Sequence, residues 1–226
     1  MFQLVRSVAA CLALALPLLG RADVVHVAVA ANFSAPAKAL AEIFAKTTGH
    51  QALLSFGATG AFYTQIKNGA PFDVLLAADD ERPIKLEHDG AIVPGSRFSY
   101  AIGQLALWSS KPAFVDDQGQ VLKGGNFSKI AIANPKLAPY GAAAVETIDQ
   151  LGLTAALQPK LVTGESIGQT YNFIATGNAE LGFVALAQVL EGGKPKGGSM
   201  WIVPARLHAP FVQDVVVLKR AAGNRA

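Results

Sequence analysis

The chain has 226 residues, 51% of them hydrophobic and 15% charged, and carries a formal net charge of +3. Residues 1–22 are typical of a secretory signal peptide, because Arg6 precedes an apolar run over residues 8–19 and small residues follow it. Removing them leaves 226 − 22 = 204 residues and a charge of +3 − 2 = +1, since Arg6 and Arg21 are lost. A nearly neutral secreted chain argues against nucleic acid as a partner and against binding to an anionic membrane surface.

Cysteine and motif content narrow the chemistry further. The single cysteine, Cys11, lies inside the predicted leader, and no later cysteine could serve as a lipoprotein anchor or form a disulfide. A chain of about 200 residues is long enough to rely on its hydrophobic core alone. The sequence has no dinucleotide fingerprint, phosphate loop or zinc-binding spacing, so we expect no cofactor and no metal-cation ligands.

The first half of the mature chain alternates between strand and helix patterns. Strands are predicted at residues 24–29, 51–56 and 72–77, and helices at residues 35–48, 61–68 and 81–89. Glycine ends the second and third of these helices, at Gly69 and Gly90, as is usual at helix ends. A βαβαβα order predicts a largely parallel sheet covered by helices on both faces.

An apolar segment at residues 98–108 leads into a second alternating half. The sequence predicts strands at residues 129–133, 160–162, 181–184 and 200–203, and helices at residues 141–151, 167–176 and 186–191. Residues 192–198 are rich in glycine and are predicted to form a flexible surface loop. Residues 211–218 read as a strand that returns to the first sheet. We therefore predict an α/β chain with domain I at residues 23–102 plus 205–226, domain II at residues 103–204, and two interdomain crossovers.

Four short segments lie where a strand is followed by a helix: residues 30–34 (AANFS), 56–60 (FGATG), 138–141 (APYG) and 165–168 (ESIG). None contains Lys or Arg. The first N–H groups of a helix have no intrahelical acceptor and lie at the positive end of its dipole, so helix starts bind anions without cationic side chains. Ligands of α/β folds bind at the carboxyl ends of strands. Together the segments predict a neutral cage for an oxyanion.

Each candidate residue in these segments also has a simpler interpretation. The Asn32 amide could donate to a ligand or cap a helix, and Thr59 could meet an anion or belong to an ordinary glycine-rich turn. Tyr140 could offer its N–H and phenol or pack at a domain boundary, and Ile167 could offer its N–H or merely follow a cap. The residues predicted to support these four are Ala31, Ala58, Gly60 and Ser166.

An enzymatic alternative comes from residues 164–168, which match the G-x-S-x-G nucleophile elbow of α/β-hydrolases. Ser166 would be the nucleophile, and Glu191 and His208 follow in the acid-then-histidine order. The acid would come from the edge of a glycine-rich loop, however, and no HGGG-like oxyanion segment is present. A secreted serine hydrolase is therefore the weaker alternative.

The segments AANF, FGATG and, most specifically, residues 69–79 (GAPFDVLLAAD) resemble the periplasmic molybdate-binding proteins of ABC transporters. The similarity continues through residues 134–141 (NPKLAPYG) and 182–184 (GFV), so it covers essentially the whole mature chain. The resemblance implies a type II periplasmic binding fold, with mixed, mostly parallel sheets, that closes over molybdate or tungstate. It also implies a monomer in the periplasm that delivers its ligand to an inner-membrane ABC permease.

The resemblance assigns roles to the four candidates. Asn32 and Thr59 match positions where the family places side-chain ligands, and Tyr140 and Ile167 match positions that supply backbone N–H groups from the second domain. One position departs from the pattern: some members carry a ligand tyrosine where this chain has Ala185, and the Tyr140 hydroxyl is expected to compensate. A donor-only cage suits a dianion and disfavours protonated phosphate. Sulfate, which differs from molybdate in size, stays open as an alternative ligand.

Overall fold

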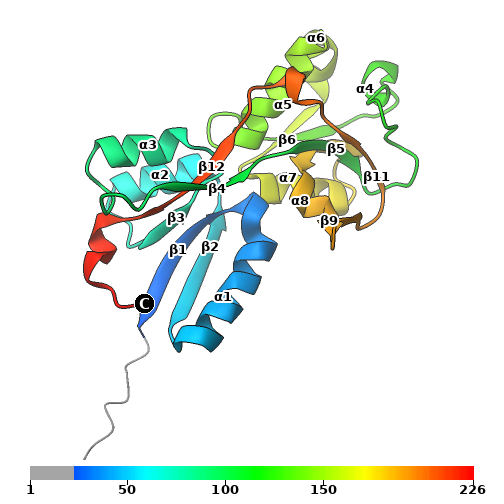
Figure 1. Ribbon diagram of the computed structural model, residues 1–226. Helices are drawn as coiled ribbons and strands as arrows, with labels where there is room; N and C mark the ends of the chain where they lie inside the picture. The colour runs from blue at the N-terminus through cyan, green and yellow to red at the C-terminus, as the bar shows by residue number, and fades with distance from the viewer. Residues whose placement is uncertain (1–22) are drawn as a thin grey trace, which may run out of the picture.

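The computed structural model describes residues 23–226, so the predicted signal peptide lies outside the described residues. Two five-stranded sheets form the framework (Figure 1). The first has the order β2-β1-β3-β12-β4. Its strands are β1 (Val24–Ala30), β2 (Gln51–Gly57), β3 (Val74–Leu76), β4 (Phe98–Ile102) and β12 (Val212–Val217). The helices around it are α1 (Ser34–Thr48), α2 (Thr59–Lys67) and α3 (Glu81–His88), with the short 3₁₀ turn η1 (Ala31–Phe33) before α1.

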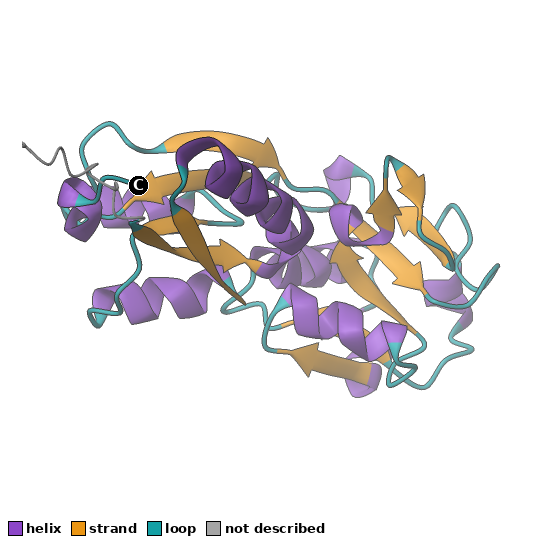
Figure 2. Cartoon of the chain, turned by 90° about the horizontal axis from the view of Figure 1, so that it is seen from below, coloured by secondary structure: helices purple, strands orange, loops and turns teal. Residues whose placement is uncertain are grey.

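Successive side chains of β1 point to opposite faces of the first sheet and pack in two different cores. Val25, Val27 and Val29 pack with Ala37 of α1 on one face of the sheet. Ala28 points to the other face, where it joins a cluster containing Phe62 of α2 and Leu86 of α3. Successive residues of a strand point to opposite faces, so a strand buried on both sides is apolar throughout. The apolar, buried part of β1 from Val27 to Ala30 is therefore explained by helices on both faces (Figure 2), whereas His26 nearer its start is exposed.

The second sheet has the order β11-β5-β8-β6-β7 and the same layered plan. Its strands are β5 (Leu105–Ser109), β6 (Ile130–Ala133), β7 (Leu161–Gly164), β8 (Leu181–Ala185) and β11 (Ser199–Ile202). Phe183 of β8 faces a core that includes Ile148 of α5 (Pro139–Gln150), whereas Val184 faces Ile174 of α7 (Ile167–Ala175). Shorter elements complete the chain: α4 (Val121–Gly124), α6 (Thr154–Leu157), η2 (Gln158–Lys160), α8 (Leu186–Val189), η3 (Ala205–Leu207) and η4 (Lys219–Gly223).

The chain passes between the two sheets twice. Residues 98–108, which the sequence presents as one apolar segment, form β4 in the first sheet and β5 in the second, separated only by Gly103 and Gln104. After β11 the chain returns, and β12 inserts between β3 and β4 in antiparallel orientation. Each sheet is mixed: the β2-β1-β3 and β7-β6-β8 pairings are parallel, and the remaining strands pair antiparallel.

Two local predictions were wrong. The helix predicted at residues 186–191 ends at Val189, because β9 (Leu190–Glu191) pairs with β10 (Lys194–Pro195). The glycine-rich stretch predicted as a flexible loop is therefore partly a hairpin, with Gly192 and Gly193 at positive φ in its turn. In addition, α2 and α5 each begin two residues before their predicted starts, at Thr59 and Pro139. These earlier starts place Thr59 and Tyr140 in the first turn of a helix.

Candidate anion-binding site

The starts of four helical segments meet at one small cavity of about 10 Å³ between the two sheets. It is lined by Ala30, Ala31, Asn32, Gly57, Ala58, Thr59, Ala78, Ala138, Pro139, Tyr140 and Ile167. The structure thus brings together the four predicted ligand residues and two of the predicted supporting residues, Ala31 and Ala58. In this arrangement the cavity has room for about one water molecule, so it is too small for a metabolite-sized solute.

Asn32 and Thr59 come from the helices of the first sheet, and both are buried. Thr59 is the first residue of α2, and its Oγ1 accepts a hydrogen bond of 2.9 Å from the backbone N–H of Ala78. A hydroxyl has one proton to donate besides its lone pairs, so this bond leaves the Thr59 proton free for the cavity. Asn32 lies in η1, and its Nδ2 donates to Oε1 of Gln213 at 3.0 Å.

Tyr140 and Ile167 come from the helices of the second sheet. Pro139 occupies the first turn of α5, where its missing N–H costs nothing, and Gly141 is the first residue there to donate back to Ala138, at 2.9 Å. Ile167 is the first residue of α7. Helix geometry leaves the N–H groups of Tyr140 and Ile167 without an intrahelical acceptor, and both residues line the cavity. They can therefore act as backbone donors.

The cavity is electrostatically neutral, because no charged side chain is among its lining residues. Asp79 directly follows the lining residue Ala78, and burial raises the pKa of its carboxyl group while Arg82 acts in the opposite direction. That carboxylate accepts from the Arg82 backbone N–H at 3.0 Å and from its guanidinium. Because the charge of Asp79 is paired with Arg82, helix dipoles and N–H groups dominate the field in the cavity.

Three hydrogen bonds join the two halves of the molecule around this cavity. The Gly60 N–H donates to Leu137 O at 2.8 Å, and Arg82 Nη2 donates to Lys136 O at 3.1 Å. Gly60 is required here, since a Cβ at this position would lie 2.9 Å from Leu137 O. On the other side of the cavity, Gln213 Nε2 of β12 donates to the hydroxyl of Tyr140 at 3.0 Å. The structure is thus in a closed arrangement.

The predicted supporting residues Gly60 and Ser166 do not line the cavity. Ser166 is the N-cap of α7, and its hydroxyl accepts from the Gln169 N–H at 3.3 Å. Over residues 23–226, no histidine is hydrogen-bonded to Ser166, and the ring of His208 instead contacts the carbonyl of Ala209. The hydroxyl is therefore used to start a helix, and the G-x-S-x-G match does not create a catalytic triad.

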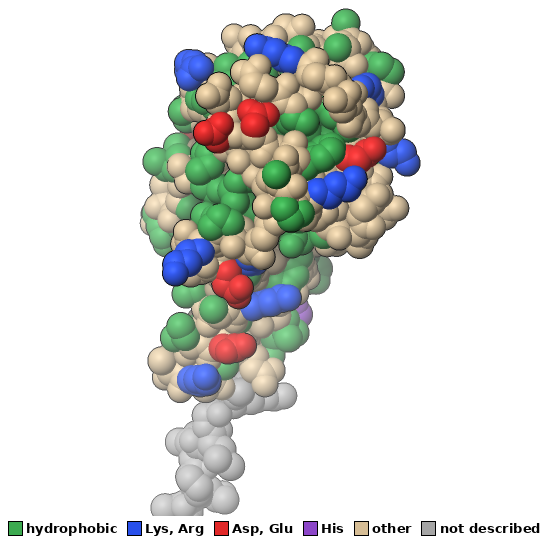
Figure 3. All heavy atoms as spheres, turned by 90° about the vertical axis from the view of Figure 1, so that its right-hand side faces the viewer, with side chains coloured by type: hydrophobic (Ala, Val, Ile, Leu, Met, Phe, Trp, Pro, Cys, Tyr) green, Lys and Arg blue, Asp and Glu red, His purple; other side chains and the backbone are tan. Residues whose placement is uncertain are grey.

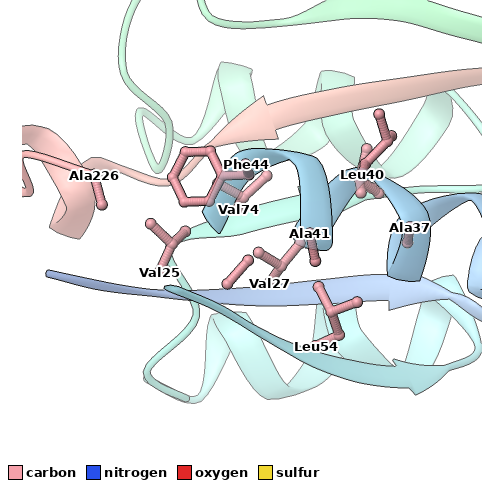
Figure 4. A pocket seen from close by; sticks show the side chains of 11 residues that line it. Val25, Val27, Ala37, Leu40, Ala41, Phe44, Leu54, Val74 and Ala226 are labelled. Atoms are coloured by element: carbon pink, nitrogen blue, oxygen red, sulfur yellow. The ribbon is translucent and has the colours of Figure 1, made fainter. Parts of the chain in front are cut away.

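Two of the larger cavities differ from the small one in character. A groove of about 750 Å³ lies beside the small cavity, shares Ala31 and Asn32 with it, and includes Lys38 and Lys196. A second pocket, of about 240 Å³, lies between α1 and the first sheet, where Leu40 and Phe44 stand over β1 (Figure 4). Its lining is entirely apolar, so it offers nothing to an anion.

On the face shown in Figure 3, basic and acidic side chains are interspersed and do not form separate positive and negative patches.

Sequence reasoning missed the residues that surround the predicted ligands. Gln213 and Asp214 are buried in the otherwise apolar strand β12, and that pair of polar residues was the available signal. The buried carboxylate of Asp214 is satisfied by hydrogen bonds from Arg97 at 2.8 Å and Ser99 at 2.7 Å. Gln213 instead connects Asn32 to Tyr140.

In the part of the chain that is described, no helix is long and apolar enough to cross a membrane.

The chain belongs to the family of bacterial extracellular solute-binding proteins, which it matches over residues 25–226, and its two mixed sheets, two crossovers and intervening cavity are in keeping with a binding protein of that family. Members of that family bind solutes and are not enzymes.

Among its relatives, the molybdate-binding protein ModA of Azotobacter vinelandii is 57% identical over 225 residues, covering 100% of this chain and 89% of that protein. ModA of Rhodobacter capsulatus is 53% identical over 220 residues, covering 97% and 85%. A solved structure of the periplasmic molybdate-binding protein of Azotobacter vinelandii superposes with a TM-score of 0.85 at 46% identity, covering 88% of this chain and 87% of that one.

Proposed function

We propose that this protein captures molybdate, or tungstate, in the small cavity and delivers it to an inner-membrane ABC permease. The single observation that carries the proposal is the convergence of four helix starts, from both sheets, on a cavity without charged side chains. Two relatives that are more than half identical to this chain are molybdate-binding proteins, which supports the same ligand.

The donor set suits a fully ionised tetrahedral dianion. Molybdate has only acceptors at neutral pH, and the Thr59 hydroxyl and the N–H groups of Tyr140 and Ile167 are donors. Monoprotonated phosphate needs an acceptor for its proton, and leaving that proton unpaired in a buried site costs about 1–3 kcal/mol. Sulfate carries the same charge as molybdate, so the radius of the cage separates the two.

Closure is proposed to occur by movement of two domains about the crossovers. Domain I comprises residues 23–102 plus 205–226, and domain II comprises residues 103–204. The sheet membership of the strands supports this division, since every strand of the first sheet lies in domain I and every strand of the second in domain II. Binding proteins of this architecture open and close around their ligand by hinge motion. The protein is proposed to act as a periplasmic monomer, exported by residues 1–22, without a nucleic-acid partner or a cofactor.

The ligand assignment is tested by titrating the purified mature protein with molybdate, tungstate, sulfate and phosphate in an isothermal calorimeter. Molybdate and tungstate are expected to bind tightly and to displace each other, and sulfate and phosphate to bind far more weakly. Tight sulfate binding without molybdate binding would refute the assignment and leave a sulfate-binding protein in its place.

The role of the cage is tested by truncating its two side-chain donors. Asn32→Ala and Thr59→Ala are each expected to weaken molybdate binding by about 1–3 kcal/mol, because each removes a buried donor to the anion. Ser166→Ala is the matched control, since Ser166 caps α7 without lining the cavity. Unchanged affinity in both cage variants would disprove the donor roles.

A further inference from the structure

Asn32, Gln213 and Tyr140 form a continuous buried chain of polar side chains beside the cavity. Their exposed fractions are 5%, 2% and 3%. Asn32 Nδ2 donates to Gln213 Oε1 at 3.0 Å, and Gln213 Nε2 donates to the Tyr140 hydroxyl at 3.0 Å. Each link joins residues far apart in sequence. A buried chain of this kind has a direction, because every donor needs an acceptor at the next position.

In the arrangement just described, Asn32 donates to Gln213 and Gln213 donates to Tyr140, so these two N–H bonds are not available to a bound anion. Both Asn32 and Tyr140 line the cavity, but one of the two N–H bonds of the Asn32 amide is used by Gln213. The remaining amide atom, Asn32 Oδ1, is buried and has no hydrogen-bond partner among the described residues. A water molecule could donate to this oxygen. An oxyanion placed against this oxygen could not, because two acceptors would face each other without a proton between them.

Rotating the side-chain amides of Asn32 and Gln213 by 180° exchanges the oxygen and nitrogen of each amide. This reverses the direction of the hydrogen bonds without moving either side chain. The Tyr140 O–H then donates to Gln213 Oε1, Gln213 N–H donates to Asn32 Oδ1, and the Asn32 NH₂ group is released to the cavity. This direction leaves no amide acceptor of the chain unpaired. Burial raises the pKa of Tyr140 to about 12, so its hydroxyl keeps the proton that starts the reversed chain.

We propose that Gln213 is a positioning residue for the anion site: by donating to Asn32 Oδ1 and accepting from Tyr140 O–H, it turns the Asn32 NH₂ group toward the bound oxyanion. This inference rests on the proposed function of the cavity. It assigns the Tyr140 side chain an indirect role through Gln213, while the Tyr140 backbone N–H stays available to the anion.

The chain also couples the orientation of Asn32 to closure. Asn32 and Gln213 belong to elements of the first sheet, η1 and β12, whereas Tyr140 belongs to α5 of the second. When the halves separate, Gln213 loses the hydroxyl that fixes its direction, and Asn32 loses its preferred orientation. Glutamine can donate to Asn32 Oδ1 and accept from the Tyr140 hydroxyl at the same time. Glutamate of similar length has no N–H for Asn32 Oδ1, and methionine has neither a donor nor a strong acceptor.

A double-mutant cycle with sodium molybdate as the probe separates positioning from a general structural role. Gln213→Met is expected to weaken molybdate binding by about tenfold, and Tyr140→Phe is expected to weaken it less. In an Asn32→Ala background, neither change should weaken binding further by more than about twofold, because the group that they orient is gone. Gln65→Met, at an exposed position of α2, is the matched control and should leave affinity unchanged.

Wild-type affinity in Gln213→Met, or effects of Gln213→Met and Asn32→Ala that multiply fully, would overturn the proposal. A melting curve of each variant shows whether it folds. If Gln213→Met does not fold, the cycle of Tyr140→Phe with Asn32→Ala decides by the same two criteria. Failure of the wild-type protein to bind molybdate would instead refute the proposed function, so the two failures are distinguishable.

Discussion

Gly60→Ala should weaken ligand binding by hindering closure while leaving the unliganded fold intact. Gly60 is the second residue of α2, and its N–H donates across the cavity region to Leu137 O at 2.8 Å. A Cβ added there would lie 2.9 Å from Leu137 O and 3.0 Å from Leu137 Cα. Gly60 is not among the residues with positive φ, so alanine suits its helical backbone, and the penalty arises only when the two halves approach.

The magnitude follows from two costs. Losing the Gly60–Leu137 hydrogen bond costs about 0.5–1.5 kcal/mol, and relieving the overlap in a packed contact costs about 1–3 kcal/mol. The gain from replacing glycine with alanine in a helix, about 0.5–1 kcal/mol, applies to the open and closed forms alike. Together these values predict a loss of about 1.5–4.5 kcal/mol in binding, or roughly 10- to 1,600-fold in affinity.

Calorimetric titration with molybdate measures the loss, and thermal melting of the ligand-free protein checks the fold. Gly124→Ala is the matched control, because Gly124 ends the short helix α4 and a Cβ there meets nothing within 4 Å. The ligand-free Gly60→Ala protein should melt at or slightly above the wild-type temperature. Wild-type affinity in Gly60→Ala would refute the tight approach of the two halves, and a large drop in melting temperature would show damage to the fold instead.

Three further predictions concern the cavity and the groove beside it. Thr59→Val should weaken molybdate binding by about 1–3 kcal/mol and lower the melting temperature, since the cavity loses a donor and the Ala78 N–H its acceptor; Thr59→Ser is the control, and equal affinity in both would contradict the role of the hydroxyl. Affinity should stay constant from about pH 6 to pH 9 and decline only as the pH approaches the Tyr140 pKa of about 12, because no titratable side chain other than Tyr140 lines the cavity; a steep change near neutral pH in calorimetric titrations would refute this. The double variant Lys38→Gln and Lys196→Gln should slow the association of molybdate with the protein a few-fold at low salt and have little effect at about 0.5 M salt, because these lysines of the groove would attract the anion electrostatically. Stopped-flow measurements test this, and a slower rate that is independent of salt would argue against electrostatic steering by the groove.

The alternation of strands and helices could be predicted wherever local signals mark both ends of an element. The sequence predicts a helix at residues 35–48, and the structure has α1 at Ser34–Thr48. Gly49 ends it with φ of 74°, a conformation that glycine adopts without strain. The helix predicted at residues 81–89 likewise ends before Gly90, whose φ is 64°. These stop signals are local, and one sequence suffices to see them.

What could not be predicted depends on partners distant in the chain. Asn32 and Gln213 are 181 residues apart, and no pattern around either residue indicates the other. The hairpin of β9 and β10 is similar, because its register is decided by pairing and its glycines resemble those of any loop. The sequence located the four segments that meet at the cavity by their shared position at strand ends, but the contacts that close the cavity required the three-dimensional arrangement.

The neutrality of the cavity has a consequence for release. A lysine or arginine on one half would keep attracting the dianion after the halves separate, because charge attraction extends over several ångströms. Helix starts and hydroxyl donors act only at hydrogen-bond distance, and their dipole effect falls off within about one turn. Asn32 and Thr59 lie on one half, and Tyr140 and Ile167 on the other. In the proposed opening, half of the donors would be removed at once, so release would not require breaking a contact with a charged side chain of the cavity lining.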